Sequence, residues 1–302
     1  MDLSPMMNFK QDEQDMDRRL SRRLDIILSI LFILLIFTSA ATAQRIAILA
    51  PDRSDQSRAF AERLSGSFGK KIEVLDRDLA SAAFTSNTHP NPFNMTADES
   101  KEVGMVIGCD FFVLIRSVIQ RRSASGRADY YEAYAVIYVV STRTGRLVDW
   151  RLQKFEADKP ENAANLLDRS AANLTADLEI RIVATAKAEI AEPKPPQMEE
   201  PPDQASPPTA NFRSPIPYRR IKPEYTAEAS FYGVAATVEI TVDLDANGTI
   251  LRTDIARWAG FGLDGSVEKA VRQMNWRPAE RGGKTLPMRF LLRYNFKKVE
   301  KE

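Results

Sequence analysis

Two segments near the C-terminus alternate apolar and polar residues with the period of a half-buried β-strand. In residues 234–244, and again in residues 288–296, every second residue is apolar, so these side chains lie on one face of the strand. Asn247-Gly248 is a strong signal for a tight hairpin into a further strand over 249–258. A stripe at helical spacing predicts a helix over 263–275, and a short helix is expected over 225–232. Residues 218–302 therefore predict an α-β-β-α-β domain with a three-stranded antiparallel sheet.

Residues 44–187 show longer apolar runs that alternate with helical patterns. Strands are expected over 45–51, 71–75, 109–119, 131–140 and 146–155, and helices over 54–67, 97–107 and 160–188. Ser54 is the expected N-cap of the first of these helices, and residues 85–96 have the composition of a loop. This order predicts an α/β sandwich with a mixed sheet. The chain as a whole is therefore expected to be α+β.

Residues 188–217 are predicted to link these two domains. Ten of the seventeen prolines fall between 188 and 223, and Glu, Gln, Ser and Ala fill most of the remaining positions. Such a composition cannot bury enough apolar surface to offset the entropy of ordering the chain. We expect an extended, polyproline-like spacer, which is either a passive tether or a spacer that crosses part of a compartment.

Residues 1–43 are predicted to be a signal peptide or a membrane anchor. Arg18, Arg19, Arg22 and Arg23 precede the apolar run 26–37, and small residues follow to Ala43. Cleavage after Ala43 would make Gln44 the mature N-terminus, whereas the 18 residues 26–43 are marginally long enough to span a membrane uncleaved. In both cases the rest of the chain is expected outside the cytoplasm, because the Arg cluster stays inside.

Charge and composition exclude several classes of function. With 42 Lys and Arg against 41 Asp and Glu, the formal net charge is +1, which provides no global field for nucleic acid. One Cys excludes an intramolecular disulfide, and one His excludes a multi-His metal site. Cys109 at the start of an apolar strand is interpreted as a buried thiol, and His89 as a solvated loop residue. No catalytic group stands out, so we expect a protein that is not an enzyme.

Two motifs in the last 85 residues require an interpretation. Asp243, Asp245 and Asn247 match the opening of a calcium loop with Asp254 at its twelfth position, but strands flank them where an EF-hand has helices. They remain a weak candidate metal site, and a plain hairpin is favoured. Residues 260–265 match GxGxxG, but the strands before them form a hairpin rather than a parallel crossover. Nucleotide binding is therefore not expected, and no cofactor is predicted.

The same C-terminal segment carries a set of separated residues that resembles the TonB C-terminal domain family. The resemblance covers residues 218–298 and agrees with the layout of apolar N-terminus, Pro-rich spacer and C-terminal domain. The matching positions are Lys222-Pro223-Glu224-Tyr225, Gly233, Asn247-Gly248, Gly260-Phe261, Leu263-Asp264, Trp276-Arg277-Pro278-Ala279, Gly283-Lys284, Pro287 and Tyr294-Asn295-Phe296. Residues 44–187 only faintly resemble the amino-terminal domains of TolB-type exported envelope proteins.

The resemblance implies a mechanical role, in which the domain captures an extended segment of an outer-membrane transporter as an added strand. The partner-binding residues expected from it are those of the last strand and one preceding tyrosine: Arg289, Phe290, Leu291, Leu292, Arg293, Tyr294 and Tyr225. Edge arginines also protect sheets from aggregation, so both roles stay open.

The resemblance also implies possible inner-membrane motor subunits as partners. Energy transducers of the family carry a His in the membrane segment, and residues 26–43 contain none. Two functions therefore stay open, namely a periplasmic TonB-like protein with energy transduction, and a cell-envelope scaffold without it.

Overall fold

The computed structural model describes residues 43–86, 91–202 and 211–297. Contacts group Gln44–Glu302 into one compact unit, which is described below. The predicted signal peptide or anchor and His89 lie outside the described residues, apart from Ala43 at the end of the former. Within the described ranges, no helix combines the length and the apolar character that a membrane crossing requires.

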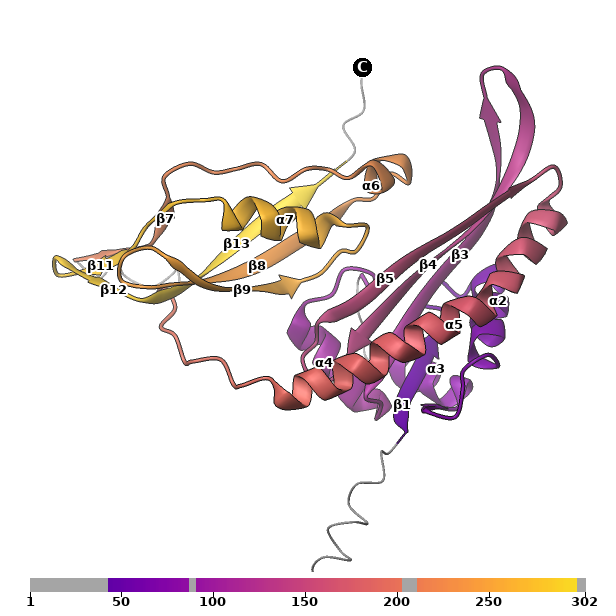
Figure 1. The fold of residues 1–302 in the computed structure, drawn as a ribbon, viewed down its shortest axis with the longest axis horizontal. Helices are drawn as coiled ribbons and strands as arrows, with labels where there is room; N and C mark the ends of the chain where they lie inside the picture. The colour runs from indigo at the N-terminus through magenta and orange to yellow at the C-terminus, as the bar shows by residue number, and fades with distance from the viewer. Residues whose placement is uncertain (1–42, 87–90, 203–210, 298–302) are drawn as a thin grey trace, which may run out of the picture. The chain divides into compact units, whose positions relative to one another are not determined.

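A five-stranded mixed sheet forms the first part of this unit (Figure 1). Its order is β2-β1-β3-β4-β5, and β1 pairs in parallel with both β2 and β3, whereas β3, β4 and β5 form an antiparallel meander. The strands are β1 (Gln44–Leu49), β2 (Ile72–Val74), β3 (Phe111–Ala124), β4 (Arg127–Ser141) and β5 (Leu147–Ala157). The α/β fold with a mixed sheet that the sequence predicted is confirmed.

Four helices pack on this sheet. They are α2 (Asp55–Ser65), α3 (Arg77–Ser86), α4 (Ala97–Ile107) and α5 (Pro160–Ala191). The Ser54 side chain accepts from the Ser57 N–H, which confirms the predicted N-cap of α2. Thr96 and Glu99 form a capping box at the start of α4. Helix α3 was not predicted from the sequence.

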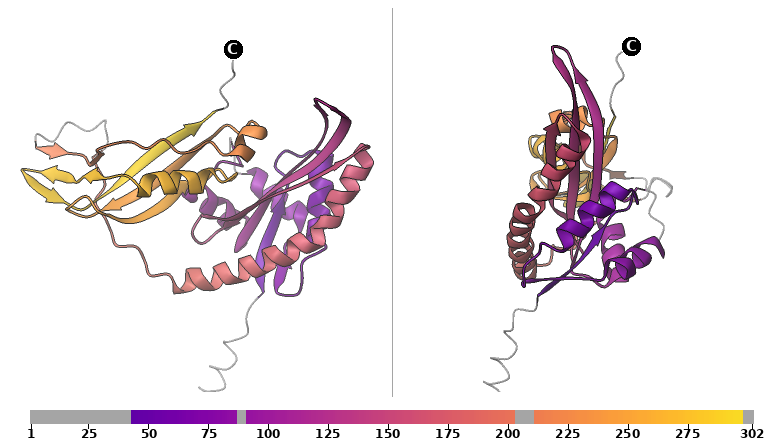
Figure 2. Two further views of the ribbon diagram at one scale, coloured as in Figure 1. Left: turned by 45° about the horizontal axis from the view of Figure 1, so that its top comes forward. Right: turned by 90° about the vertical axis from the view of Figure 1, so that its right-hand side faces the viewer.

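The two faces of the sheet have separate apolar cores. Phe60 and Leu64 of α2 and Leu174 of α5 belong to one core, and α5 follows this face along its length (Figure 2). The opposite core contains Ala80 of α3 and Val103 of α4, together with Tyr138 of β4. Apolar side chains of residues 229–296 belong to this second core as well. The C-terminal part therefore completes the covering of the sheet.

The C-terminal part has the predicted three-stranded antiparallel sheet, in the order β13-β8-β9. Its elements are α6 (Ala227–Phe231), β8 (Ala236–Leu244), β9 (Ile250–Arg257), α7 (Leu263–Arg272) and β13 (Met288–Phe296). Four residues of α7 are buried, namely Leu263, Val267, Ala270 and Val271, which is the stripe that predicted this helix. Met274 of the predicted stripe lies beyond the end of the helix and is also buried.

The segment between the two parts has more regular structure than its composition indicated. Helix α5 continues to Ala191, and β6 (Phe212–Arg213) and β7 (Ile216–Pro217) form within the range predicted as linker. β6 pairs with β11 (Ala279–Arg281), which also pairs with β12 (Lys284–Leu286), and β7 pairs with β10 (Trp276–Arg277). None of β6, β7, β10, β11 and β12 was predicted. The division into separate domains at 187 and 218 stays a prediction.

One amide side chain joins the loop before α4 to the C-terminal sheet. Asn94 is 7% exposed, and its Nδ2 donates to the carbonyl oxygens of Thr237 (2.8 Å) and Trp258 (2.6 Å). Its Oδ1 accepts from the Thr237 N–H at 2.9 Å. Thr96 forms a bridge to Arg257 at the end of β9. Residues 94–96, in the segment predicted as a loop over 85–96, therefore contact the C-terminal sheet and occupy part of the outer edge of β9.

Aromatic residues fill the same contact. Tyr138 lies 5.7 Å from Trp258 and 6.5 Å from Phe261 between ring centroids, and Trp150 stacks on Phe261 at 5.4 Å. The Trp258 indole N–H donates to the Ser100 hydroxyl at 3.1 Å, so its one polar atom is satisfied inside the core. These contacts bury the sheet face that α3 and α4 leave open.

We expect Asn94→Ala to lower the free energy of unfolding by about 2–4 kcal/mol, because three side-chain hydrogen bonds are lost and backbone groups of partly buried Thr237 and buried Trp258 lose their partners. Urea-induced unfolding of the full-length chain measures the change. Asn162→Ala is the matched control, since Asn162 is exposed on α5 and bonds only to Asp158 among the hydrogen bonds described. Equal midpoints for the two variants would contradict the role of Asn94.

Candidate functional site

The outer edge of β13 is the candidate site. Each of its nine residues faces a partner on β8, from Met288 opposite Leu244 to Phe296 opposite Ala236. β13 is the terminal strand of its sheet in the described part of the chain, as the sequence predicted. Half of its backbone N–H and C=O groups therefore point away from the sheet, which is the geometry that accepts an added strand.

A hydrogen bond from the linker identifies which residues point outward. The N–H of Arg289 donates to the carbonyl of Glu199 at 2.8 Å, on the side away from β8. In an antiparallel pair, inward and outward backbone groups alternate. The backbone of Leu291, Arg293 and Asn295 therefore faces outward with Arg289, and the residues between them bond to β8. The first outward position is already occupied by the linker.

The two predicted arginines form ion pairs across the strands. The Arg289 guanidinium donates to Asp243 at 2.6 and 2.8 Å, and Arg293 donates to Glu239 at 2.7 Å. Both carboxylates are buried, and the hydrogen bond to Asp243 raises the pKa of Arg289. These arginines neutralise acids of β8. They are therefore less available to a charged partner than the sequence alone indicated.

The other predicted partner-binding residues lie in three different environments. Leu291 is 47% exposed and lies on the outer face with the arginines. Phe290 packs edge-on against Trp276 at 5.9 Å, and Leu292 is buried in the core. Tyr225 stacks on Phe296. The edge therefore presents to solvent its outward backbone and the exposed side chains of Leu291, Arg293 and Asn295.

Two tyrosine hydroxyls near β13 differ in their hydrogen bonding. The Tyr225 hydroxyl bonds to the carbonyls of Val234 (2.8 Å) and Ala229 (3.1 Å), which fixes the start of α6. The Tyr294 hydroxyl is buried without a hydrogen-bond partner among the described residues, and burial raises the pKa of Tyr294. An unpartnered buried hydroxyl is uncommon in folded proteins. Tyr294 is thus a polar group of the edge strand whose hydrogen-bonding capacity is unused in the described part of the chain.

The weak candidate metal ligands are each held by other groups. Asp243 pairs with Arg289, and Asp254 pairs with Arg252 and with Arg146 at 2.8 Å. Asp245 accepts from the N–H groups of Asn247 (2.8 Å) and Thr249 (2.7 Å), and the bond from Thr249 is the main cause of its lowered pKa. Across the described ranges, no group of three His, Cys, Asp or Glu residues is placed to hold a metal ion. The Asp245 carboxylate stabilises the hairpin turn.

The GxGxxG motif forms a turn that inserts an aromatic ring into the core. Gly260, Phe261 and Gly262 all have positive φ, at 71°, 52° and 73°. A Cβ on Gly260 would lie 2.6 Å from the Tyr138 ring, so a larger residue cannot fit there. The partly buried Asp264 carboxylate accepts from the N–H groups of Ala259 (2.8 Å) and Gly260 (2.7 Å). Gly260 and Asp264 therefore hold the turn that places Phe261 in the core.

The thiol of Cys109 is buried, and burial raises its pKa to about 11. At neutral pH the thiol is therefore protonated and unreactive, in agreement with its interpretation as a buried, inert group.

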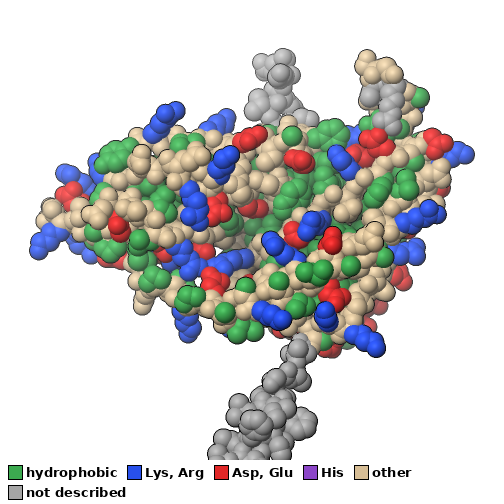
Figure 3. Space-filling view, in the orientation of Figure 1, with side chains coloured by type: hydrophobic (Ala, Val, Ile, Leu, Met, Phe, Trp, Pro, Cys, Tyr) green, Lys and Arg blue, Asp and Glu red, His purple; other side chains and the backbone are tan. Residues whose placement is uncertain are grey.

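The face of the molecule in Figure 3 shows Lys and Arg interspersed with Asp and Glu, with hydrophobic side chains between them. No single-sign patch dominates that face.

Comparison with known proteins supports the family resemblance of the C-terminal part. Residues 221–297 match the family model described as Gram-negative bacterial TonB protein C-terminal. The solution structure of the Pseudomonas aeruginosa TonB C-terminal domain is 20% identical, covers 32% of this chain and 93% of its own, and has a TM-score of 0.25. No curated protein matches the chain.

Residues outside that segment have structural neighbours among lipoproteins and uncharacterised proteins. The lipoprotein GNA1162 from Neisseria meningitidis is 15% identical, with 49% of this chain and 98% of its own covered and a TM-score of 0.30. The hypothetical protein CT253 from Chlamydia trachomatis is 12% identical, with 49% and 97% covered and a TM-score of 0.27. Likenesses at these scores support no inference on function.

We expect Asp264→Asn to become more stable relative to the parent chain as the pH rises from 4 to 7. Burial raises the pKa of Asp264 to about 6, above its value in the unfolded chain. The folded state therefore binds the proton more tightly, and its stability falls as the pH rises through this window. Over this pH range, the free energy of unfolding of the variant should rise relative to that of the parent chain by at most about 3 kcal/mol. Urea unfolding at several pH values measures it, and a difference that does not vary with pH would contradict the assignment.

Proposed function

We propose that this chain is a TonB-like protein of the cell envelope that binds an outer-membrane transporter, or another envelope protein, by strand addition at β13. The observation that carries the proposal is the row of outward backbone groups at Leu291, Arg293 and Asn295 on a terminal strand. An extended partner segment bonds to this row through its own backbone, and contacts with the Leu291 side chain select among sequences. The family match of residues 221–297 supports the same role.

The linker limits how much of the β13 edge is open to a partner strand. Glu199 bonds through its carbonyl to the Arg289 N–H, and its carboxylate pairs with Arg281. A partner strand that extends over the whole of β13 has to displace this backbone contact, whereas one that begins at Leu291 does not. We propose that the partner pairs with residues 291–295.

A second candidate function is an envelope scaffold without energy transduction. The extensive contact between the C-terminal part and the first sheet favours it, because Asn94 and Tyr138 hold the domain in one compact unit. The absence of His from residues 26–43 is in agreement with this alternative. Energy transduction through inner-membrane motor subunits is proposed only as part of the first candidate function, the TonB-like protein.

We propose a periplasmic location, reached through a cleaved signal with Gln44 as the new N-terminus or as a single-pass inner-membrane protein. We also propose that the chain acts by binding and not as an enzyme. The protonation of Cys109 supports this, because the one thiol of the chain is unavailable as a nucleophile at neutral pH.

We expect Leu291→Pro to weaken binding of a transporter segment about tenfold or more while the domain stays folded. Proline removes an outward N–H and adds a ring at the edge, but it removes no bond to β8. The measurement is titration of the full-length chain with extended peptides from the periplasmic segments of the outer-membrane transporters of the same organism. Leu291→Ala is the matched control, because it keeps the N–H and shortens the side chain.

The two variants separate backbone pairing from side-chain contact. Loss of binding in the proline variant with retention in the alanine variant supports strand addition at β13. Unchanged affinity in a folded proline variant would exclude this edge as the site. Thermal melting confirms that each variant is folded before its affinity is compared.

The mature N-terminus distinguishes the two candidate functions. We expect mass analysis of the exported protein to give either the intact chain or a start at Gln44. A start at Gln44 excludes direct coupling through a membrane helix and supports the scaffold. An intact N-terminus that co-purifies with motor subunits supports energy transduction.

A further inference from the structure

The first sheet has a topological switch point at β1. The chain leaves β1 through α2 and returns as β2 on one side, and it leaves β2 through α3 and α4 to return as β3 on the other side. Both neighbours are parallel to β1. The buried residues of α2 and of α3 belong to the cores on opposite faces. In open α/β sheets, a crevice forms where such crossovers diverge, beyond the carboxyl end of the strand.

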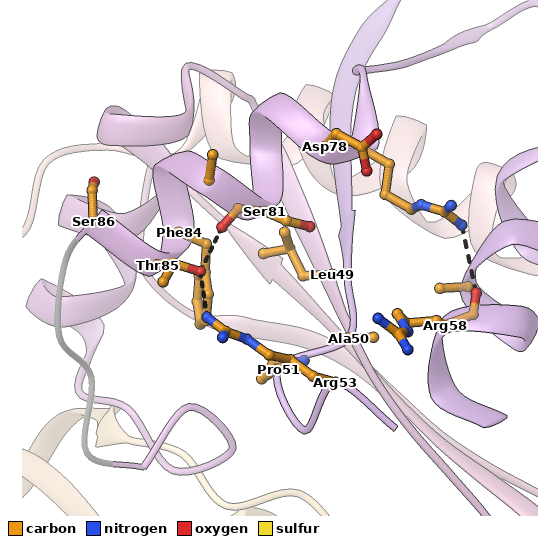
Figure 4. A pocket seen from close by; sticks show the side chains of 13 residues that line it. Leu49, Ala50, Pro51, Arg53, Arg58, Asp78, Ser81, Phe84, Thr85 and Ser86 are labelled. Atoms are coloured by element: carbon orange, nitrogen blue, oxygen red, sulfur yellow. Dashed lines mark hydrogen bonds between the residues drawn. The ribbon is translucent and has the colours of Figure 1, made fainter. Parts of the chain in front are cut away.

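A cavity of about 800 Å³ lies at that carboxyl end. Its wall includes Leu49 at the end of β1, Ala50 and Pro51 immediately after it, and Phe84 of α3 (Figure 4). These side chains give the cavity an apolar side. A volume of this size is in the range of small-molecule sites in proteins.

Three arginines provide the charged groups of the same cavity, namely Arg53, Arg58 and Arg77. The acid in its lining is Asp78. Arg58 pairs with Asp55, and Arg77 lies 3.8 Å from Glu62, at the outer limit of an ion pair. Guanidinium groups that line a concave surface can bind carboxylate and phosphate oxygens through paired N–H donors.

Arg53 differs from the other two in its backbone and its partners. Its φ is 53°, in the left-handed region that residues with a side chain seldom adopt. Its guanidinium reaches over the cavity to donate to the Thr85 hydroxyl at 3.1 Å (Figure 4). No carboxylate of the described residues lies within ion-pair distance of it. Strained backbone that holds an unneutralised cation over a cavity is typical of binding sites.

We propose that this cavity binds a small organic anion, with its carboxylate or phosphate group between Arg53 and Arg58 and its apolar part against Pro51 and Phe84. The site is separate from the β13 edge and does not depend on the strand-addition function. It assigns a role to residues 44–86, for which the TonB C-terminal domain provides none.

Calorimetric titration of the full-length chain with phenyl phosphate, benzoate and inorganic phosphate tests the proposal. We expect at least one of the two aromatic anions to bind more tightly than inorganic phosphate, because only they contact the apolar wall. The tighter of the two identifies the head group. Arg53→Gln should weaken that binding about tenfold, as expected for the loss of one charge-assisted hydrogen-bonding partner.

Arg169→Gln is the matched control, because it removes the same charge from an exposed position on α5. We expect it to leave the affinity unchanged. Arg58→Gln provides a second variant if Arg53→Gln does not fold, and it should also weaken binding. Three outcomes would overturn the proposal, namely no binding of either aromatic anion at millimolar concentration, inorganic phosphate binding as tightly as both, or equal affinities in the cavity variants and the control.

Discussion

The five-stranded sheet has two apolar faces, and the need to cover both determines the arrangement of the rest of the chain. Helices α2 and α5 cover one face, whereas α3 and α4 cover only part of the other. The exposed remainder would leave aromatic side chains such as Tyr138 in water, at a cost that grows with the apolar area. The C-terminal part supplies the missing cover through Trp258 and Phe261. Its position on the sheet therefore follows from the same hydrophobic effect that folds each part.

The elements that the sequence predicted correctly are those whose signal is local. The alternation in β8 and β13, the Asn247-Gly248 hairpin and the Ser54 cap depend on neighbours within a few residues, and all are confirmed. Helix α3 was not predicted because it buries little apolar surface, and Ala80 is its one buried residue. The strands between 276 and 286 are two or three residues long, too short to show a period.

The contacts over long sequence distances could not be predicted in the same way. Asn94 in a polar loop carries no sign that it bonds to residues 143 and 164 positions away. The arginines of β13 read as exposed edge charges, because the buried acids that neutralise them lie on a different strand and in a register known only from the structure. For the candidate site, the edge strand itself was predictable, but the direction of its backbone groups required the bond from Arg289 to Glu199.

The order of strands separates the two surfaces of the C-terminal domain. β8 is central, so β9 and β13 are the two edges of one sheet. The bridge between Thr96 and Arg257 uses the β9 edge for contact with the first part of the unit, and Arg257 also bonds to the Asn94 carbonyl. Because these contacts lie on the far side of β8, an added strand at residues 291–295 has no need to break them. The C-terminal part can therefore keep its β9 contacts with the first sheet while β13, the opposite edge, stays open for the strand addition that we propose.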